Sequence, residues 1–303
     1  MNVRVPLKLR QLQYFLTASQ TLHFSRAADQ LFVTQPTLSH QIAELESHVG
    51  MPLFDRMGKA VRLTEAGTVF ALYARRALSE LEAGCNALAE LEGMVRGTLR
   101  IGVSQSFVRK LLPPILGEFA RRCPSITLSI EEMTARGIED QLSEGLIDLG
   151  IAFAPSVLDE TELEPILEER LLLVTGVDNP LGHRDKVDMA ELNNVSLALF
   201  SQHYSTRKLI NRYLAEAGAV PRVMCETNTI DVLLGIVAES PIATIVPEGA
   251  LVSTSNLCIV PLSNPVPIRI SALLWAKHAF KTAPARTFAH LVRERFKTEL
   301  PLV

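Results

Sequence analysis

The spacing of apolar residues predicts short helices at the start of the chain. Over residues 8–19 the apolar positions follow the 3.6-residue period of an amphipathic helix. They are Leu9, Leu12, Phe15 and Leu16. A second helix is predicted from Ser25, whose hydroxyl can cap the first backbone amides, through Leu31.

A third helix is predicted between Thr34, a candidate N-cap, and Gly50, a C-terminal stop. Pro36 then lies in the first turn, where its missing N–H costs nothing, whereas in mid-helix it would cost about 3 kcal/mol. The apolar stripe of this helix is Leu38, Ile42, Leu45 and Val49. The first two turns also carry polar residues, and such a helix-turn-helix can place them at base edges in the major groove of DNA.

The next segment, "PLFDRMGKAVRLTEAG", predicts two short extended pieces around Gly58. Such a wing would bring basic side chains to phosphates beside the groove. Thr64 can then cap a long helix over residues 65–92. Its apolar seam alternates in steps of four and three, which suits pairing with another helix. The seam comprises Phe70, Ala74, Ala77, Leu81, Gly84, Leu88 and Leu91. We expect a dimerising linker; packing on its own domain is the alternative.

From Thr98 the pattern changes to short apolar strands that alternate with helices, which is typical of an α/β domain with mostly parallel sheets. The predicted strands are "TLRIGVS", "ITLSIEEM", "IDLGIAF", "RLLLVTG", "VSLALF", "VMCET", "IATIVP" and "IRISALLW". The predicted helices cover 108–123, 136–144 and 207–217. Two smaller sheets with a ligand crevice between them fit this length. The acidic run 158–170 is expected to be a solvated connection.

Charge divides the chain in the same place as the pattern. The first 65 residues carry seven basic and five acidic side chains, a net of +2, and the remainder carries 23 and 28, a net of −5. A basic front on an acidic body suits a small module that binds a polyanion. Neither a membrane span nor a signal peptide is predicted, so the expected location is the cytoplasm.

Candidate chemistry other than DNA binding finds little support in the residues. The four cysteines form no C-x-x-C pair and there is no H-x-x-x-H motif, so no metal or other cofactor is expected. A thiol-sensing pair of Cys225 and Cys258 stays open as an alternative. An enzyme on the α/β body is a more distant one, since no G-x-S-x-G elbow occurs. A structural nucleoid protein would need a larger basic excess.

These residues also resemble a known family. The stretch "FSRAADQLFVTQPTLSHQIAELESHVGMPLFDRMGKAVRLTEAG" resembles the winged helix-turn-helix of LysR-type transcriptional regulators, with A-A-x-x-L, S/T-Q-P-x-L-S and P-L-F-x-R in order. The body agrees in layout, including "TLRIGVS" and "IDLGIAF". Within the family, "IEDQLSEGLIDLGIAFAP" and "STRKLINRYLAEAG" look most like the activator of the cyanate-degradation operon.

The resemblance implies an architecture and a set of partners. It implies an α/β fold class with an N-terminal winged helix-turn-helix (1–65), a dimerising linker helix (66–93) and a two-lobed effector domain like a periplasmic binding protein (94–303). Lobe I would comprise about 98–168 and 270–303, and lobe II about 169–269. The implied partners are an operator in double-stranded DNA, a small-molecule effector, RNA polymerase and further copies of the chain, as a homotetramer (a dimer of dimers).

The resemblance also implies which residues meet DNA and effector. The expected DNA-binding residues are Arg26, Gln35, Pro36, Thr37, Ser39, His40, Gln41, Arg56, Lys59 and Arg62. The expected effector-binding residues, at strand ends and helix starts between the lobes, are Ser104, Gln105, Ser106, Phe153, Phe200, Ser201, His203, Thr206, Asn228 and Thr229. Hydroxyls and free amides at helix starts favour an anion, such as cyanate. An aromatic or organic acid, or a redox signal, is the alternative stimulus.

One stretch departs from the family pattern. "VAESPIATIVP" stands where many members have a Gly-Leu-Gly turn before the strand, so the shape of a site built there need not follow the family.

Overall fold

The structure, a computed structural model, describes residues 7–57, 60–91, 96–154, 158–251 and 255–296. The chain divides into two compact units. The first is Met1–Leu88 with Glu144–Leu146, and the second comprises Ala89–Ser143 and Ile147–Val303.

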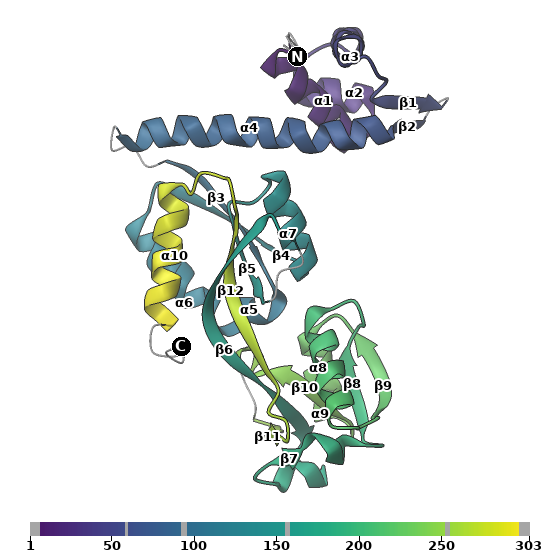
Figure 1. Cartoon of the computed structure of the whole chain (residues 1–303), viewed down its shortest axis with the longest axis vertical. Coiled ribbons are helices and arrows are strands. Elements are labelled where there is room, and N and C mark those ends of the chain that lie inside the picture. Colours follow the sequence, from purple (N-terminus) through teal and green to yellow (C-terminus); the bar gives the residue numbers. More distant parts are fainter. Residues whose placement is uncertain (1–6, 58–59, 92–95, 155–157, 252–254, 297–303) are drawn as a thin grey trace. The chain divides into compact units, whose positions relative to one another are not determined.

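The first unit begins with three helices and a two-stranded antiparallel wing (Figure 1). Its elements are α1 (Leu9–Thr21), α2 (Phe24–Gln30), α3 (Gln35–Val49), β1 (Phe54–Met57) and β2 (Ala60–Leu63). Phe15 lies fully buried at the centre, with its ring centroid 5.4 Å from that of Phe54 and 5.2 Å from that of Phe70. Tilted and edge-to-face ring pairs of this kind add to the stability of an apolar core.

The helix ends follow the predicted caps with one exception. Thr34 accepts a hydrogen bond from the Thr37 N–H at 3.4 Å, and Gly50 ends α3 in the left-handed region at φ +79°. The predicted Ser25 cap was wrong: the N-cap is His23, whose Nδ1 accepts from the Arg26 N–H at 3.3 Å. The cap lies two residues earlier than predicted because Phe24 is buried in the core and belongs to the first turn of the helix.

The long helix α4 (Glu65–Leu91) starts at Thr64, whose Oγ1 accepts from the Gly67 N–H at 2.9 Å. The first residues of the predicted seam were expected to face another helix, but they face the core of the helix-turn-helix. Ala74 is buried in that core, and Phe70 packs against it. Among the side chains described on α4, residues 65–88, the large apolar ones that are exposed are Val69, Tyr73, Leu81 and Leu88. In the N-terminal half of α4 the exposed apolar stripe therefore lies one residue before the predicted seam, at Val69 and Tyr73, because Phe70 and Ala74 complete the small core.

The second unit is built on a mixed sheet in the order β4-β3-β5-β12-β6-β10-β8-β9, with β11 paired to β6 and β7 (Figure 1). The strands are β3 (Gly97–Val103), β4 (Ile126–Glu132), β5 (Leu149–Phe153), β6 (Thr161–Gly176), β7 (Val187–Asp188), β8 (Ser196–Phe200), β9 (Arg222–Thr227), β10 (Ala243–Pro247), β11 (Leu257–Ser263) and β12 (Ile268–Ala276). The outer strands pair in parallel, whereas β6 and β12 run antiparallel to their neighbours. The α/β class and the two-lobed layout are confirmed.

The acidic run 158–170 is not a solvated connection, as was expected. Its residues 161–170 form the first part of the 16-residue strand β6, and this part of β6 pairs with β12. Apolar residues between the acids, Ile166 and Leu167 among them, are buried in lobe I. The two long strands β6 and β12 thus pass from one lobe to the other and join them.

Helices cover the sheets of both lobes. They are α5 (Gln105–Lys110), α6 (Leu112–Arg122), α7 (Ala135–Glu144), α8 (Ser205–Glu216), α9 (Ile230–Ala238) and α10 (Ala283–Phe296), with short 3-10 turns η1 (Pro180–His183), η2 (Met189–Leu192) and η3 (Glu248–Ala250). The predicted helix 108–123 is two helices, since α5 ends before Leu111 and α6 begins after it. Among the described residues, no helix is both long and apolar enough to cross a membrane.

Candidate functional site

The N-terminal half of α3 presents a polar face. Its exposed residues are Gln35, Pro36, Thr37 and His40, while Ser39 and Gln41 are half-buried. The opposite side is fully buried through Leu38, Ile42 and Leu45. Two faces of one helix are thus used differently, one for the core and one free to meet another molecule.

Local hydrogen bonds hold these polar side chains in place. The Gln35 Nε2 donates to the Ser39 Oγ at 2.8 Å, and the Gln41 Nε2 donates to the Glu44 Oε2 at 3.0 Å. The Thr34 and Thr37 hydroxyls lie 2.8 Å apart. The Gln35 amide keeps a second N–H and its carbonyl oxygen for a base edge, and glutamine pairs with adenine in this way.

The expected phosphate-binding residues lie on the flanking elements. Arg26 is exposed on α2, and Arg62 is exposed on β2 opposite Asp55. The backbone of Arg56 pairs with that of Val61 in the wing. The side chain of Arg56 and the whole of Lys59 lie outside the described parts of the structure.

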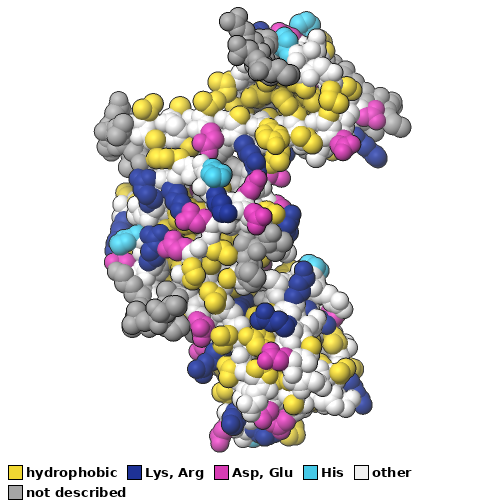
Figure 2. Space-filling view, in the orientation of Figure 1, with side chains coloured by type: hydrophobic (Ala, Val, Ile, Leu, Met, Phe, Trp, Pro, Cys, Tyr) yellow, Lys and Arg dark blue, Asp and Glu magenta, His cyan; other side chains and the backbone are white. Residues whose placement is uncertain are grey.

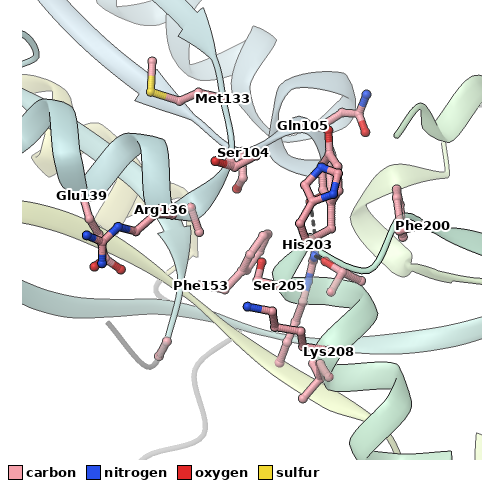
Figure 3. A pocket seen from close by; sticks show the side chains of 18 of the residues that line it. Ser104, Gln105, Met133, Arg136, Glu139, Phe153, Phe200, His203, Ser205 and Lys208 are labelled. Carbon is pink, nitrogen blue, oxygen red and sulfur yellow. Dashed lines mark hydrogen bonds between the residues drawn. The ribbon is translucent and has the colours of Figure 1, made fainter. Parts of the chain in front are cut away.

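The second unit contains a cavity of about 390 Å³ between its lobes (Figure 3). Lobe I contributes α5, α7 and the end of β5; lobe II contributes the end of β8 and the start of α8. Seven of the ten expected effector residues line it: Ser104, Gln105, Ser106, Phe153, Phe200, His203 and Thr206. Residues not foreseen also line it: Met133, Thr134, Ala135, Arg136, Glu139, Ala154, Tyr204, Ser205, Lys208, Leu209, Arg212, Ile230 and Arg269.

The structure does not bring the other three expected residues to this cavity. The Ser201 N–H donates to the Thr227 carbonyl at 2.9 Å, which extends the β8–β9 pairing. Asn228 and Thr229 bond to each other through their side chains at 3.2 Å. Their neighbour Ile230 lines the cavity in their place.

A buried ion pair lies at the junction of the lobes. The Arg269 guanidinium donates to Glu169 from Nε at 2.9 Å and from Nη2 at 2.7 Å, and each residue is only 4% exposed. Arg269 also donates to the Ser106 Oγ of lobe I at 2.8 Å and to the Thr206 Oγ1 of lobe II at 3.1 Å. Its guanidinium carbon stands 3.7 Å from the ring centroid of Phe153. Burial lowers the pKa of Arg269, and the facing Glu169 carboxylate opposes that shift.

The sequence analysis did not predict this ion pair. Glu169 lies in the acidic run, and Arg269 sits in the predicted strand "IRISALLW", where a charge is expected to face solvent. The available signal was the alternation Glu162-Leu163-Glu164, which has the period of a strand. That period identifies the strand, but the pairing of residues 100 positions apart follows only from the β6–β12 register.

One further acid, Glu139 of α7, lines the cavity but is only 1% exposed, and its Oε2 accepts the Leu158 N–H at 2.9 Å. The remaining basic residues belong to the outer part. Arg136 pairs with Asp140 along α7 at 3.0 Å. On lobe II, Lys208 and Arg212 are exposed and four residues apart on α8, and Figure 3 shows the Lys208 side chain extending toward the side of Phe153. Arg212 stacks on the Tyr213 ring at 5.2 Å. Basic side chains also gather on lobe II beside the junction of the lobes in Figure 2.

The thiols lie apart from the cavity. Cys225 is on β9 and Cys258 on β11, with β8, β10 and β6 between them in the sheet. At about 4.8 Å per strand spacing, roughly 19 Å separates the two positions, whereas a disulfide needs Cα atoms within about 7 Å. Within the described ranges, no cluster of three or more His, Cys, Asp or Glu could hold a metal ion.

Comparison with known proteins gives the family. Residues 9–68 match the family model "Bacterial regulatory helix-turn-helix protein, lysR family", and residues 92–297 match "LysR substrate binding domain". The chain is 30% identical over 295 residues to the Hca operon transcriptional activator HcaR of Escherichia coli, covering 95% of this chain and 98% of that protein.

Solved structures show the same architecture. Full-length OxyR from Pseudomonas aeruginosa superposes with a TM-score of 0.76 at 25% identity, over 96% of this chain and 95% of that one. CbnR in complex with its target DNA superposes with a TM-score of 0.70 at 23% identity, over 95% of this chain and 100% of that one. The chain therefore belongs to the LysR family of DNA-binding transcriptional regulators.

Proposed function

We propose that this regulator activates transcription when an organic anion closes the two lobes over the cavity between them. The observation that supports this most directly is the cavity itself, which both lobes line and which has cationic Lys208 and Arg212 on one wall. A ligand that touches both lobes favours one relative pose of the lobes. It can shift the equilibrium only as far as its affinities for the two poses differ.

The volume bears on the class of effector. Small-molecule sites typically have volumes of about 300–1,000 Å³, so a cavity of about 390 Å³ is of the usual size for a ligand with several carbon atoms. Cyanate has three heavy atoms and would fill only a small part of it. Phe153 and Phe200 offer aromatic surface, and Ser104 and Thr134 offer polar atoms. We therefore favour an aromatic or other organic carboxylate, with cyanate as the smallest candidate.

The charge at the cavity supports an anion with its charged end toward lobe II. The Arg269 charge is already compensated by Glu169, and Arg136 is compensated by Asp140. On α8, by contrast, no carboxylate among the described residues forms an ion pair with Lys208 or Arg212. A carboxylate near these two cations would leave the apolar part of the ligand against Phe153.

For DNA binding, we propose that the exposed stripe of α4 joins two chains. Figure 2 shows hydrophobic side chains gathered along α4, and those exposed there include Tyr73, Leu81 and Leu88. A dimer would place two recognition helices about 34 Å apart, one turn of DNA. A dimer of dimers in the cytoplasm, in contact with RNA polymerase, completes the proposal.

The testing experiment is fluorescence anisotropy of the purified protein on DNA from upstream of its own gene, with random DNA as control. It is run at fixed salt, with cyanate and with a series of aromatic and aliphatic carboxylates. Specific binding that a carboxylate alters supports the proposal. If specific binding responds to cyanate and to none of the carboxylates, the effector is the smaller anion and not a carboxylate. Binding without preference for the upstream DNA would remove the regulator proposal.

The proposed orientation of the ligand, with its charged end toward lobe II, is tested separately by titration calorimetry. Lys208→Met should weaken the active carboxylate about tenfold, and the matched change Lys186→Met, at an exposed lobe II position outside the cavity, should leave its affinity unchanged. Equal affinities for Lys208→Met and the unmodified protein would refute the contact with α8.

A further inference from the structure

A single carboxylate connects the recognition helix to the wing. Glu46 lies in the last turns of α3, and its Oε1 accepts the Leu53 N–H at 2.8 Å and the Phe54 N–H at 3.0 Å. Phe54 is the first residue of β1, so the two amides belong to the entry of the wing. One side-chain oxygen thus accepts both backbone N–H groups at the start of the hairpin.

The two amides lie where water has little access. Leu53 is fully buried and Phe54 is 5% exposed, with its ring against those of Phe15 and Phe24. A buried N–H without an acceptor destabilises the fold, because it has given up its hydrogen bond to water and gained none in return. Bonds to a charged acceptor are stronger than neutral ones, so Glu46 holds this backbone more firmly than a neutral acceptor would.

The opposite side of the same segment is held by the start of α4. The Thr64 N–H donates to the Leu53 carbonyl at 3.0 Å, and the Thr64 Oγ1 donates to the Pro52 carbonyl at 2.8 Å. At Gly67 a Cβ would lie 2.0 Å from the Leu53 carbonyl oxygen, so only glycine allows this approach. The base of the wing is therefore fixed between two helices, and Glu46 is the contact on the side of the recognition helix.

We infer that Glu46 is a positioning residue for DNA binding: it sets the place of the wing, and with it Arg56, relative to the recognition helix. Arg56 follows Phe54 by two residues in β1. Phosphate contacts fix the register of a protein on the duplex, so the wing must keep a set distance from the helix that reads the bases. The inference rests on the proposed contact of the wing with DNA.

A double-mutant cycle on the full-length protein tests it. The variants are Glu46→Ala, Arg56→Ala and both together, measured by anisotropy on the upstream DNA from 0.05 to 0.3 M salt. Loss of one phosphate contact should weaken binding about fivefold at 0.15 M salt, because log K changes by about 0.9 log[salt] per phosphate. We expect Glu46→Ala to show the same loss and the same reduction of the salt slope by about one. The double variant should be no weaker than Arg56→Ala alone.

The controls separate positioning from charge and from folding. Asp29→Ala removes an equal charge from an exposed site on α2, and like any loss of negative charge near DNA it should leave binding equal or tighter. Glu46→Gln keeps the accepting oxygen and should restore most of the affinity. Thermal melts identify any variant whose first unit is unfolded at the assay temperature, and the cycle is then measured at a lower temperature at which all its members are folded.

Each outcome decides between the possibilities. Losses that multiply in the double variant would show that Glu46 acts independently of Arg56 and overturn the inference. Glu46→Gln as weak as Glu46→Ala, with an unchanged melting temperature, would also overturn it. Normal binding by Arg56→Ala would exclude the wing contact while leaving the regulator intact. If the unmodified protein bound the upstream DNA no better than random DNA, the proposed function itself would be wrong.

Discussion

The two candidate binding regions of this protein are assembled in opposite ways. The residues expected to contact DNA come from one continuous stretch, residues 26–62, in which α2 and α3 each start at a cap within the stretch or next to it. The cavity between the lobes takes residues from Ser104 to Arg269, and its central ion pair joins residues 100 positions apart. A local site can be anticipated from sequence, while the members of a distant one depend on sheet register.

The two regions also differ in how they handle charge. Basic residues near the recognition helix, such as Arg26, are exposed and free to reach phosphates. At the cavity the most buried cation, Arg269, already has its counterion. Loss of an exposed cation should weaken binding with little effect on folding, whereas loss of the buried one should affect folding first.

The largest effect is therefore expected for Arg269→Met. It leaves the Glu169 carboxylate buried without its countercharge, with only the Gly249 N–H and the Ser271 hydroxyl as donors, and loss of one member of a buried pair typically costs about 3–5 kcal/mol of the free energy of unfolding. Denaturant unfolding of the full chain measures the change, and Arg212→Met at an exposed site is the control. The double change Glu169→Leu with Arg269→Met should recover much of the loss, because it removes both charges. A stability unchanged within 1 kcal/mol in Arg269→Met would contradict the role of the pair.

The next effect is expected at the recognition helix. Gln35→Ala should cost about 1–3 kcal/mol on the operator and relax the preference at one base position. Anisotropy on operator and random DNA measures both, with Gln30→Ala on α2 as the matched amide control. Equal losses on the two DNAs would place Gln35 outside the groove.

A smaller, less selective effect is expected for Arg26. Arg26→Ala should weaken all DNA sequences about equally and lower the salt slope by about one. A salt titration on operator and random DNA gives both values. If only the operator were affected, Arg26 would be a base-reading residue and not a phosphate contact.

The smallest effect concerns pH and the exposed surface of lobe I. Hydrogen bonds from Arg293, one of them 2.8 Å long, lower the pKa of the Glu164 carboxyl below its ordinary value of 4.5. The folded pKa is depressed, so this pair stabilises the fold fully above the unfolded pKa and the contribution is lost as pH falls through the folded pKa. Arg293→Met should therefore lower the melting temperature slightly at neutral pH, with the difference shrinking below about pH 4.5.

The control for this pair is Arg295→Met on the exposed face of the same helix. It should leave the pH dependence of melting as in the unmodified protein. A difference for Arg293→Met that persisted at pH 3 would mean that packing, and not the charge of Glu164, is responsible.

Local signals in the sequence predicted much of this molecule. The cap at Thr34, the stop at Gly50 and the stripe of Leu38, Ile42 and Leu45 determine α3, because caps and helical periodicity act over a few residues. The eight predicted strands are all present, since short apolar runs between turns identify them. The same local reasoning put a cap at Ser25 and Phe70 in the exposed seam, because it could not see that Phe24 and Phe70 complete one core.

Only the tertiary structure decided which residues meet between the lobes. Ser201, Asn228 and Thr229 stand at strand ends, as predicted, but none of them lines the cavity: Ser201 bonds to Thr227 at the end of the β8–β9 pair, and Asn228 and Thr229 bond to each other. Glu169 belongs to the run that was expected to be solvated, yet it lies buried against Arg269, because the antiparallel register of β6 and β12 places the two residues opposite each other. Local chemistry determines a helix and its exposed face; long-range pairing determines which charges share the interior.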